Sequence, residues 1–99
     1  MVVNFKKLSE NACIPTRAHL SDAGIDLYAC LTNPICIPPL ESRVISTEIA
    51  WEPVTVNGHS CCMIIKSRSG LAFNFSVEAS NAGVLDRDWE TNRISKASI

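Results

Sequence analysis

Proline and turn residues interrupt this chain too often for long helices. Residues 32–42, TNPICIPPLES, hold three of the five prolines, which exclude a helix there and favour an extended or edge segment. Asn57-Gly58 is a strong hairpin signal. No segment has an amphipathic helical pattern, and residues 70–75, GLAFNF, predict at most one helical turn. Short apolar or alternating runs predict strands at residues 1–8, 25–31, 43–51, 61–67, 76–79 and 82–86. Many short strands with closely spaced turns predict an all-β fold, a sandwich or a jelly-roll barrel.

Length and composition favour a single globular domain over residues 1–99. Hydrophobic residues make up 46% of the chain and charged residues 19%, which is typical of globular proteins. So short a chain buries a small share of its surface, and we expect a partner or further copies of the chain to supply part of its core. The formal net charge of −1 provides no overall positive field, and residues 1–15 lack a long apolar run. We therefore expect no direct nucleic-acid partner and no membrane partner.

The cysteines give no sign of a metal site. Their number, five, is odd, and their spacing matches no zinc pattern. We predict reduced, mostly buried thiols in a cytoplasmic or nuclear protein, and a structural disulfide stays open as an alternative.

A basic, glycine-bearing segment, KSRSGLAF at residues 66–73, follows the apolar run 61–65. Arg68 can grip phosphate oxygens with its planar fork. Gly70 allows a close backbone approach and a positive φ, and a concave run of N–H groups forms an anion nest. The segment therefore predicts a phosphate-binding turn, although a plain polar turn with an exposed arginine accounts for the same residues.

Two carboxylates lie four residues apart in SDAGIDLYA, residues 21–29. On an extended strand Asp22 and Asp26 share a face, with Gly24 between them. Carboxylate oxygens near a phosphate turn suit Mg²⁺, which usually keeps several waters. The alternative is that Asp22 caps a turn and Asp26 is a solvated strand residue.

A third segment, NAGVLDRDWE at residues 81–90, ends a short apolar run in an acid. Asp86 could orient and deprotonate a water molecule, and Trp89 offers a flat face for a base or a sugar. An edge strand followed by a turn and a half-buried tryptophan is the alternative.

These three segments, in this order, resemble the first three of the five sequence motifs of the trimeric dUTP diphosphatases (dUTPases). The resemblance covers residues 13–89 and leaves a divergent tail at 90–99. It implies an all-β subunit, a jelly-roll-like distorted barrel of the dUTPase type, here lacking the C-terminal strands. It also implies a homotrimer with active sites between subunits. Its activity would be Mg²⁺-dependent hydrolysis of dUTP to dUMP and pyrophosphate, which limits uracil incorporation into DNA.

The resemblance also implies roles for individual residues. Asp26 would hold Mg²⁺, largely through its waters, and Asp86 would be the catalytic residue that positions the attacking water and the sugar 3′-hydroxyl. Phosphate contacts would come from Arg68, Ser69 and Gly70. The other substrate-binding positions would be the uracil-reading segment with Asn81, Gly83, Val84 and Leu85, and the deoxyribose-packing residue Trp89.

The chain departs from the family pattern at three places. Trp89 replaces the usual tyrosine, and Glu48 stands where the family commonly has glycine. Beyond Trp89 the chain matches neither the fourth nor the fifth motif, and we expect the polar segment 87–99 to be a frayed tail that closes no sheet. A truncated, catalytically impaired nucleotide-binding or protein-interaction module is therefore the alternative to an active enzyme. A related dCTP deaminase is disfavoured by the RSG sequence and by Asp86.

Overall fold

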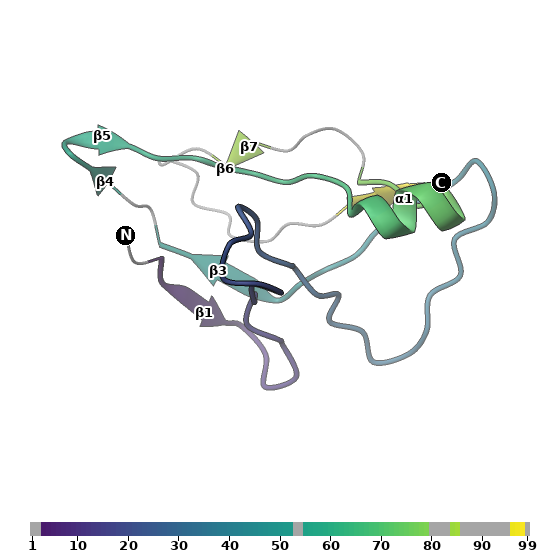
Figure 1. The fold of residues 1–99 in the computed structure, drawn as a ribbon. Helices are drawn as coiled ribbons and strands as arrows, with labels where there is room; N and C mark the ends of the chain where they lie inside the picture. Colours follow the sequence, from purple (N-terminus) through teal and green to yellow (C-terminus); the bar gives the residue numbers. More distant parts are fainter. Residues whose placement is uncertain (1–2, 53–54, 80–83, 86–95, 99) are drawn as a thin grey trace.

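Short strands dominate the computed structural model of this chain, which describes residues 3–52, 55–79, 84–85 and 96–98 (Figure 1). The elements in chain order are β1 (Phe5–Lys7), β2 (Ser42–Val44), β3 (Ile49–Trp51), β4 (Thr55–Val56), β5 (His59–Ser60), β6 (Met63–Ile64), α1 (Ser69–Phe75), β7 (Val84–Leu85) and β8 (Lys96–Ser98). Within the described residues no helix is long and apolar enough to span a membrane.

The strands join in antiparallel pairs that mostly link distant parts of the sequence. The pairs are β1 with β3, β2 with β8, β4 with β5, and β6 with β7. In Figure 1 the β1–β3 pair lies below the line formed by β4, β5 and β6, and α1 lies at the opposite end from the β4–β5 hairpin. Such non-sequential pairing is how jelly-roll folds bring separate segments into one body.

The core is built around β3. Its residues Ile49, Ala50 and Trp51 are 6%, 7% and 8% exposed, so both faces of this strand are covered, as in a strand buried between two layers. Main-chain bonds continue the β1–β3 ladder at both ends, from Leu8 N–H to the Glu48 carbonyl at 2.8 Å and from Glu52 N–H to the Asn4 carbonyl at 3.0 Å. Ala12 and Thr47 are also buried.

The strand predicted at 43–51 is wrong as one continuous element, because Glu48 breaks it into β2 and β3. Glu48 has a φ of 50°, in the left-handed region that costs a side chain about 1–2 kcal/mol. Its backbone N–H donates to Ser46 Oγ at 3.1 Å, and that hydroxyl donates to Glu48 Oε1 at 2.9 Å. This local pair of bonds holds the chain in a conformation that glycine adopts freely.

The hairpin predicted at Asn57-Gly58 is confirmed. Val56 pairs with His59, so the loop contains two residues, and their φ values are 50° and 78°. A two-residue hairpin with both central φ values positive is the type I′ geometry that Asn-Gly favours.

Helix α1 is longer than the sequence predicted. It begins directly after Arg68, covers seven residues instead of a single turn, and ends at Ser76, whose φ is 55°. The Ser76 N–H donates to the Ala72 carbonyl at 3.0 Å. Gly70 is part of this helix, so the predicted glycine turn is wrong. Gly70 does not adopt the positive φ that glycine allows.

Two further predicted strands are shorter than expected: one is reduced to a single bridge and the other to a two-residue strand. Residues 25–31 form no strand, and the single bridge between Thr16 and Asp26 is their contribution to strand pairing among the described residues. A strand was also predicted at 61–67; among the described residues its paired part is Met63–Ile64, which joins β7. Neither segment has, among the described residues, a partner strand that would extend its hydrogen-bonded pairing.

The polar tail and the cysteines also differ from expectation. Lys96–Ser98 forms β8 and pairs with β2, so the prediction that segment 87–99 closes no sheet is wrong. All five cysteines are free thiols, three of them exposed and two half-buried, so the expectation of mostly buried thiols is also wrong. Short strands leave too little packed core to cover these side chains.

Candidate functional site

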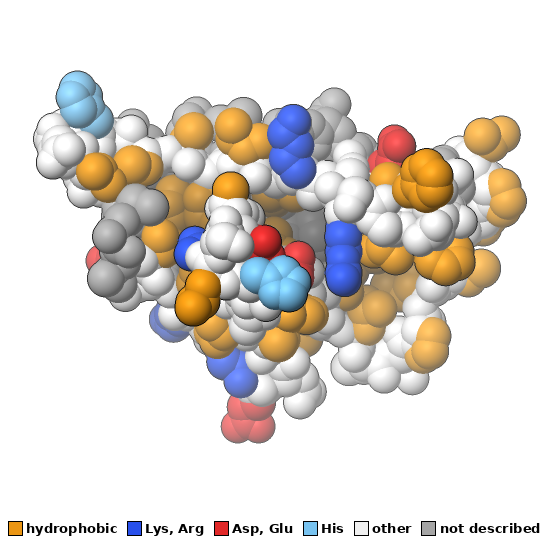
Figure 2. All heavy atoms as spheres, in the orientation of Figure 1, with side chains coloured by type: hydrophobic (Ala, Val, Ile, Leu, Met, Phe, Trp, Pro, Cys, Tyr) orange, Lys and Arg blue, Asp and Glu red, His pale blue; other side chains and the backbone are white. Residues whose placement is uncertain are grey.

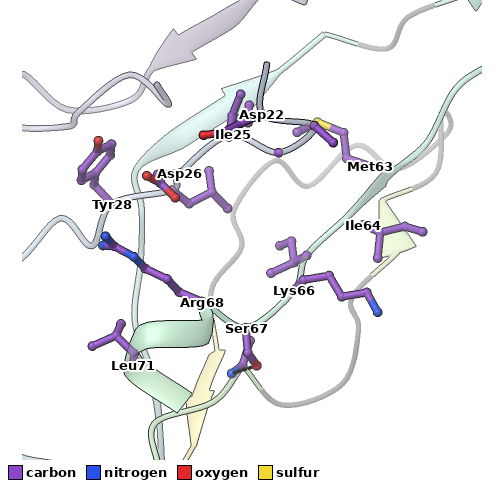
Figure 3. Close-up of a pocket in the computed structure, with 15 residues that line it drawn as sticks. Asp22, Ile25, Asp26, Tyr28, Met63, Ile64, Lys66, Ser67, Arg68 and Leu71 are labelled. Atoms are coloured by element: carbon purple, nitrogen blue, oxygen red, sulfur yellow. Dashed lines mark hydrogen bonds between the residues drawn. The ribbon is translucent and has the colours of Figure 1, made fainter. Parts of the chain in front are cut away.

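One open cavity of about 780 Å³ lies between the segment 22–28 and the segment 63–68. Leu71 of α1 and Ala79 complete its wall. Figure 3 shows the two segments on either side of the cavity, with Arg68 of one extending toward the side where Asp26 of the other lies. The cavity therefore joins the first and second of the three segments that the sequence singled out.

Asp26 provides a half-buried carboxylate on the cavity wall. Its main chain is fixed by Thr16: Asp26 N–H donates to the Thr16 carbonyl at 2.7 Å, and Thr16 N–H donates to the Asp26 carbonyl at 3.4 Å. The carboxylate itself has no hydrogen bond or ion pair with any residue that the structure describes. A fixed backbone thus carries an anionic side chain that has no partner among the described residues.

Arg68 faces Asp26 from the start of α1. It occupies the N-cap position, and its side chain makes no capping hydrogen bond. In Figure 3 the side chain extends toward the side of the cavity where Asp26 and Tyr28 lie. Its guanidinium pairs with no carboxylate among the described residues. Because neither charge is neutralised by a protein group among the described residues, both side chains remain available for a ligand.

Asp22 lines the same cavity but already has a structural partner. Its Oδ2 accepts from the His19 N–H at 3.0 Å, and its own N–H donates to the His19 carbonyl at 3.0 Å. This is the turn-capping role that the sequence left open for Asp22. The two aspartates therefore differ: Asp22 closes a turn, and Asp26 has no side-chain partner in the part of the chain that the structure describes.

The remaining predicted site residues differ in how they lie relative to the cavity. Ser69 and Gly70 begin α1 directly after Arg68, and neither lies on the cavity wall. Val84 and Leu85 form β7 and pair with Ile64 and Met63, which do line the cavity. Four predicted positions lie outside the described residues, namely Asn81, Gly83, Asp86 and Trp89.

The structure adds residues that the sequence did not single out. Tyr28 lines the cavity, and its hydroxyl lies 2.6 Å from Thr16 Oγ1. Lys66 supplies a second cation on the wall, and Ser67 Oγ accepts from the Ala79 N–H at 2.9 Å. The spacing of Asp26 and Tyr28, two residues apart on an extended chain, was a signal for Tyr28. No local sequence pattern predicted the bond from the Ala79 N–H to Ser67 Oγ.

The charges at this site suit a divalent cation and an anionic ligand together. Figure 2 shows acidic side chains in the middle of this face with basic side chains on either side. Mg²⁺ prefers oxygen ligands and is commonly held by one or two carboxylates, waters and phosphate oxygens. The free carboxylate of Asp26 fits that donor set. Within the described residues no three His, Cys, Asp or Glu side chains gather into a complete metal cage, so ligand oxygens would have to share the coordination.

Comparison with known proteins identifies one family. The dUTPase family model matches residues 10–95. The deoxyuridine 5′-triphosphate nucleotidohydrolase of Clostridioides difficile is 39% identical over 85 residues, which cover 85% of this chain and 55% of that protein. The chain spans about half the length of such curated relatives.

Solved structures agree with this family in fold. A dUTPase from phage phi11 of S. aureus, reported with a structural Mg(II) ion, superimposes with a TM-score of 0.77 at 28% identity. The match covers 99% of this chain and 60% of that one. A Staphylococcus bacteriophage 80alpha dUTPase solved with dUPNHPP gives a TM-score of 0.76 at 28% identity, covering 97% and 53% of the two chains. The predicted all-β, jelly-roll-like fold of the dUTPase type is confirmed.

Proposed function

Because the chain belongs to the dUTPase family, we propose that it hydrolyses dUTP to dUMP and pyrophosphate with Mg²⁺, which would limit uracil incorporation into DNA. One observation carries the proposal. Asp26 and Arg68 come from distant segments, line one cavity, and both have side chains without described partners. A metal-bound triphosphate needs such a pair, one anionic group for the cation and one cationic group for the phosphate oxygens.

The proposed chemistry follows from these charges. Bound Mg²⁺ would neutralise phosphate oxygens and polarise the phosphorus under attack. Asp26 would hold the cation largely through its waters, and Arg68 would bind phosphate oxygens with its fork. Main-chain N–H groups at the first turn of α1, in Ser69 and Gly70, have no intrahelical partner and would contribute further contacts to phosphate.

The third segment would complete the reaction. We assign Asp86 as the catalytic residue that positions and activates the attacking water. The same segment would bind the nucleoside, with main-chain groups of Asn81, Gly83, Val84 and Leu85 reading uracil and Trp89 packing on the deoxyribose. Val84 and Leu85 support this placement, because β7 pairs with the strand whose residues line the cavity.

The same proposal includes assembly as a homotrimer with sites between subunits, in a cytoplasmic or nuclear setting where thiols stay reduced. Helix α1 has no buried residue, and Phe73 and Phe75 are 91% and 68% exposed. Large apolar side chains gathered on one short helix are typical of an interaction surface. Burial against neighbouring subunits would also compensate for the small core.

A second candidate is nucleotide binding without turnover, coupled to a protein contact. The exposed apolar side chains of α1 favour it, since this helix begins directly after Arg68 and so joins a proposed phosphate contact to exposed phenylalanines. The phage 80alpha dUTPases, which are similar to this chain, are described as controlling transfer of virulence genes by a G protein-like mechanism.

The test is pyrophosphate release from dUTP with Mg²⁺, beside dCTP and UTP, for this chain and for Asp86→Asn. We expect hydrolysis of dUTP alone and loss of activity in the variant. A particle mass near three times the chain's 10.8 kDa, measured by light scattering on the same samples, would support the trimer. If the folded protein binds dUTP and releases no pyrophosphate, the second candidate replaces the first. Conversion of dCTP would contradict both.

A further inference from the structure

A direct contact joins the side chains of Thr16 and Tyr28 at the edge of the cavity. The Thr16 Oγ1 and the Tyr28 hydroxyl oxygen are 2.6 Å apart, and either can donate. This separation is within the range of a well-formed O–H···O hydrogen bond. Tyr28 is 37% exposed and lines the cavity, so its ring is anchored at the hydroxyl end while one side remains open to a ligand.

The geometry of the chain places this contact beside Asp26. Thr16 and Asp26 are directly opposed across an antiparallel bridge, so their side chains point to the same face. Tyr28 is two residues beyond Asp26 and shares that face too. Figure 3 shows Tyr28 and Asp26 on the same side of the cavity, toward which Arg68 extends.

Few other bonds hold the segment that carries Asp26. Between Ile25 and Cys30, the described main-chain anchors are the two bonds to Thr16 and the bond from the Cys30 N–H to the Ser46 carbonyl at 2.8 Å. The bridge is isolated, with no flanking ladder. A side-chain bond from Thr16 to Tyr28 therefore contributes a substantial part of the restraint on this segment.

We propose that Thr16 and Tyr28 form a positioning pair, whose hydroxyl contact fixes the Asp26 segment and the Tyr28 ring so that the cavity binds the Mg²⁺–nucleotide complex. Thr16 holds Asp26 through the main chain and Tyr28 through the side chain, and so couples the two. Without the contact, the Tyr28 ring can sample other rotamers, and the Asp26 carboxylate loses one of its indirect supports. The inference rests on the proposed function, because it assigns a partner to the same cavity.

The test measures binding of the imido analogue dUpNHpp by calorimetry, with Mg²⁺ and again with EDTA. Thr16→Val keeps the β-branched shape and removes the hydroxyl, and Tyr28→Phe removes the same bond from the other side. Each variant should weaken Mg²⁺-dependent binding about fivefold, the size expected for one hydrogen bond. The double variant should be no weaker than either single variant, because both remove one contact.

Controls separate positioning from general stability. Thr16→Ser retains a hydroxyl and should restore most of the affinity, while Thr55→Val, in the exposed part of β4, should bind like the unmodified protein. In EDTA the variants should differ less from the unmodified protein than they do with Mg²⁺, a change that simple destabilisation would not produce.

The outcomes are distinguishable. If the unmodified protein binds the analogue and both variants bind it equally well, the positioning pair is refuted and the proposed function stands. If the losses of the two single variants add in the double variant, the coupling is refuted. If the unmodified protein binds no analogue under either condition, the proposed function fails, and the positioning pair fails with it.

Discussion

The β1–β3 pair and the cavity differ in how far their residues are buried and bonded to the rest of the chain. In the pair, β3 is buried on both faces and main-chain bonds continue past both strand ends. In the cavity, Asp26 and Arg68 have side chains without described partners, and few bonds support the segment around Asp26. A partly buried charge without a partner costs folding free energy, but it remains available for a ligand. Stability and ligand binding are thus assigned to separate parts of a small chain, and substitutions should separate them.

Removing buried volume from β3 should have the largest effect. Ile49→Ala should lower the free energy of unfolding by about 2–5 kcal/mol, because Ile49 is 6% exposed and a cavity would remain. Urea denaturation followed by tryptophan fluorescence measures this. The matched control is Leu20→Ala, at a side chain 97% exposed, which should change stability by less than about 0.5 kcal/mol. Equal losses at the two positions would show that β3 does not form a stabilising core.

A substitution in the cavity should have the opposite effect, lowering activity while leaving stability nearly unchanged. Arg68→Gln should reduce kcat/KM for dUTP about 100-fold, since it removes a cation that would stabilise charge on the phosphates. The urea midpoint should stay nearly unchanged, because the guanidinium has no described partner to lose. Arg43→Gln is the matched control, as Arg43 pairs with Glu41 at 2.8 Å on the protein surface, and its kcat/KM should match that of the unmodified protein. A large loss of stability in Arg68→Gln would show that the two regions are not separate.

A smaller effect is expected at Glu48, next to the core strand. Glu48→Gly should be more stable than Glu48→Ala by about 1 kcal/mol, because both lose the side-chain bond to Ser46 but glycine alone accepts the φ of 50° without strain. Thermal and urea unfolding of the two variants give the difference. If the two variants are equally stable, the backbone at residue 48 is not strained, and the left-handed conformation there costs the core region no stability.

Local signals in the sequence predicted the turns and the composition of the site better than they predicted the strands. Asn57-Gly58 specified its hairpin because both residues accept a positive φ. The predicted strand at 25–31 became an extended segment with one bridge, since strand formation depends on partners elsewhere in the chain. The break at Glu48 was not predicted either, because it depends on a hydrogen bond formed by Ser46.

For the site, the residue types indicated the chemistry, and the structure supplied the proximity. Asp26 and Arg68 were both singled out from their own segments, and their shared cavity follows from the tertiary fold. The contact between Tyr28 and Thr16 was missed, because a hydrogen bond between side chains on two separate segments leaves no local pattern. Tyr28 itself had a signal in its spacing from Asp26, which places the two side chains on one face. The expected glycine turn after Arg68 gave way to α1, in which Gly70 is helical.

The pairing of β1 with β3 has a consequence for how the chain folds. Phe5 meets Trp51 across that ladder, so β1 has no strand to pair with until the ribosome has released the chain beyond β3. The β4–β5 hairpin, closed by a two-residue loop, needs no such distant partner and can form as soon as its own residues emerge. The pairing of the buried strand β3 therefore waits for a large loop to close, and until it does, the apolar side chains of β3 are exposed to whatever binds nascent chains.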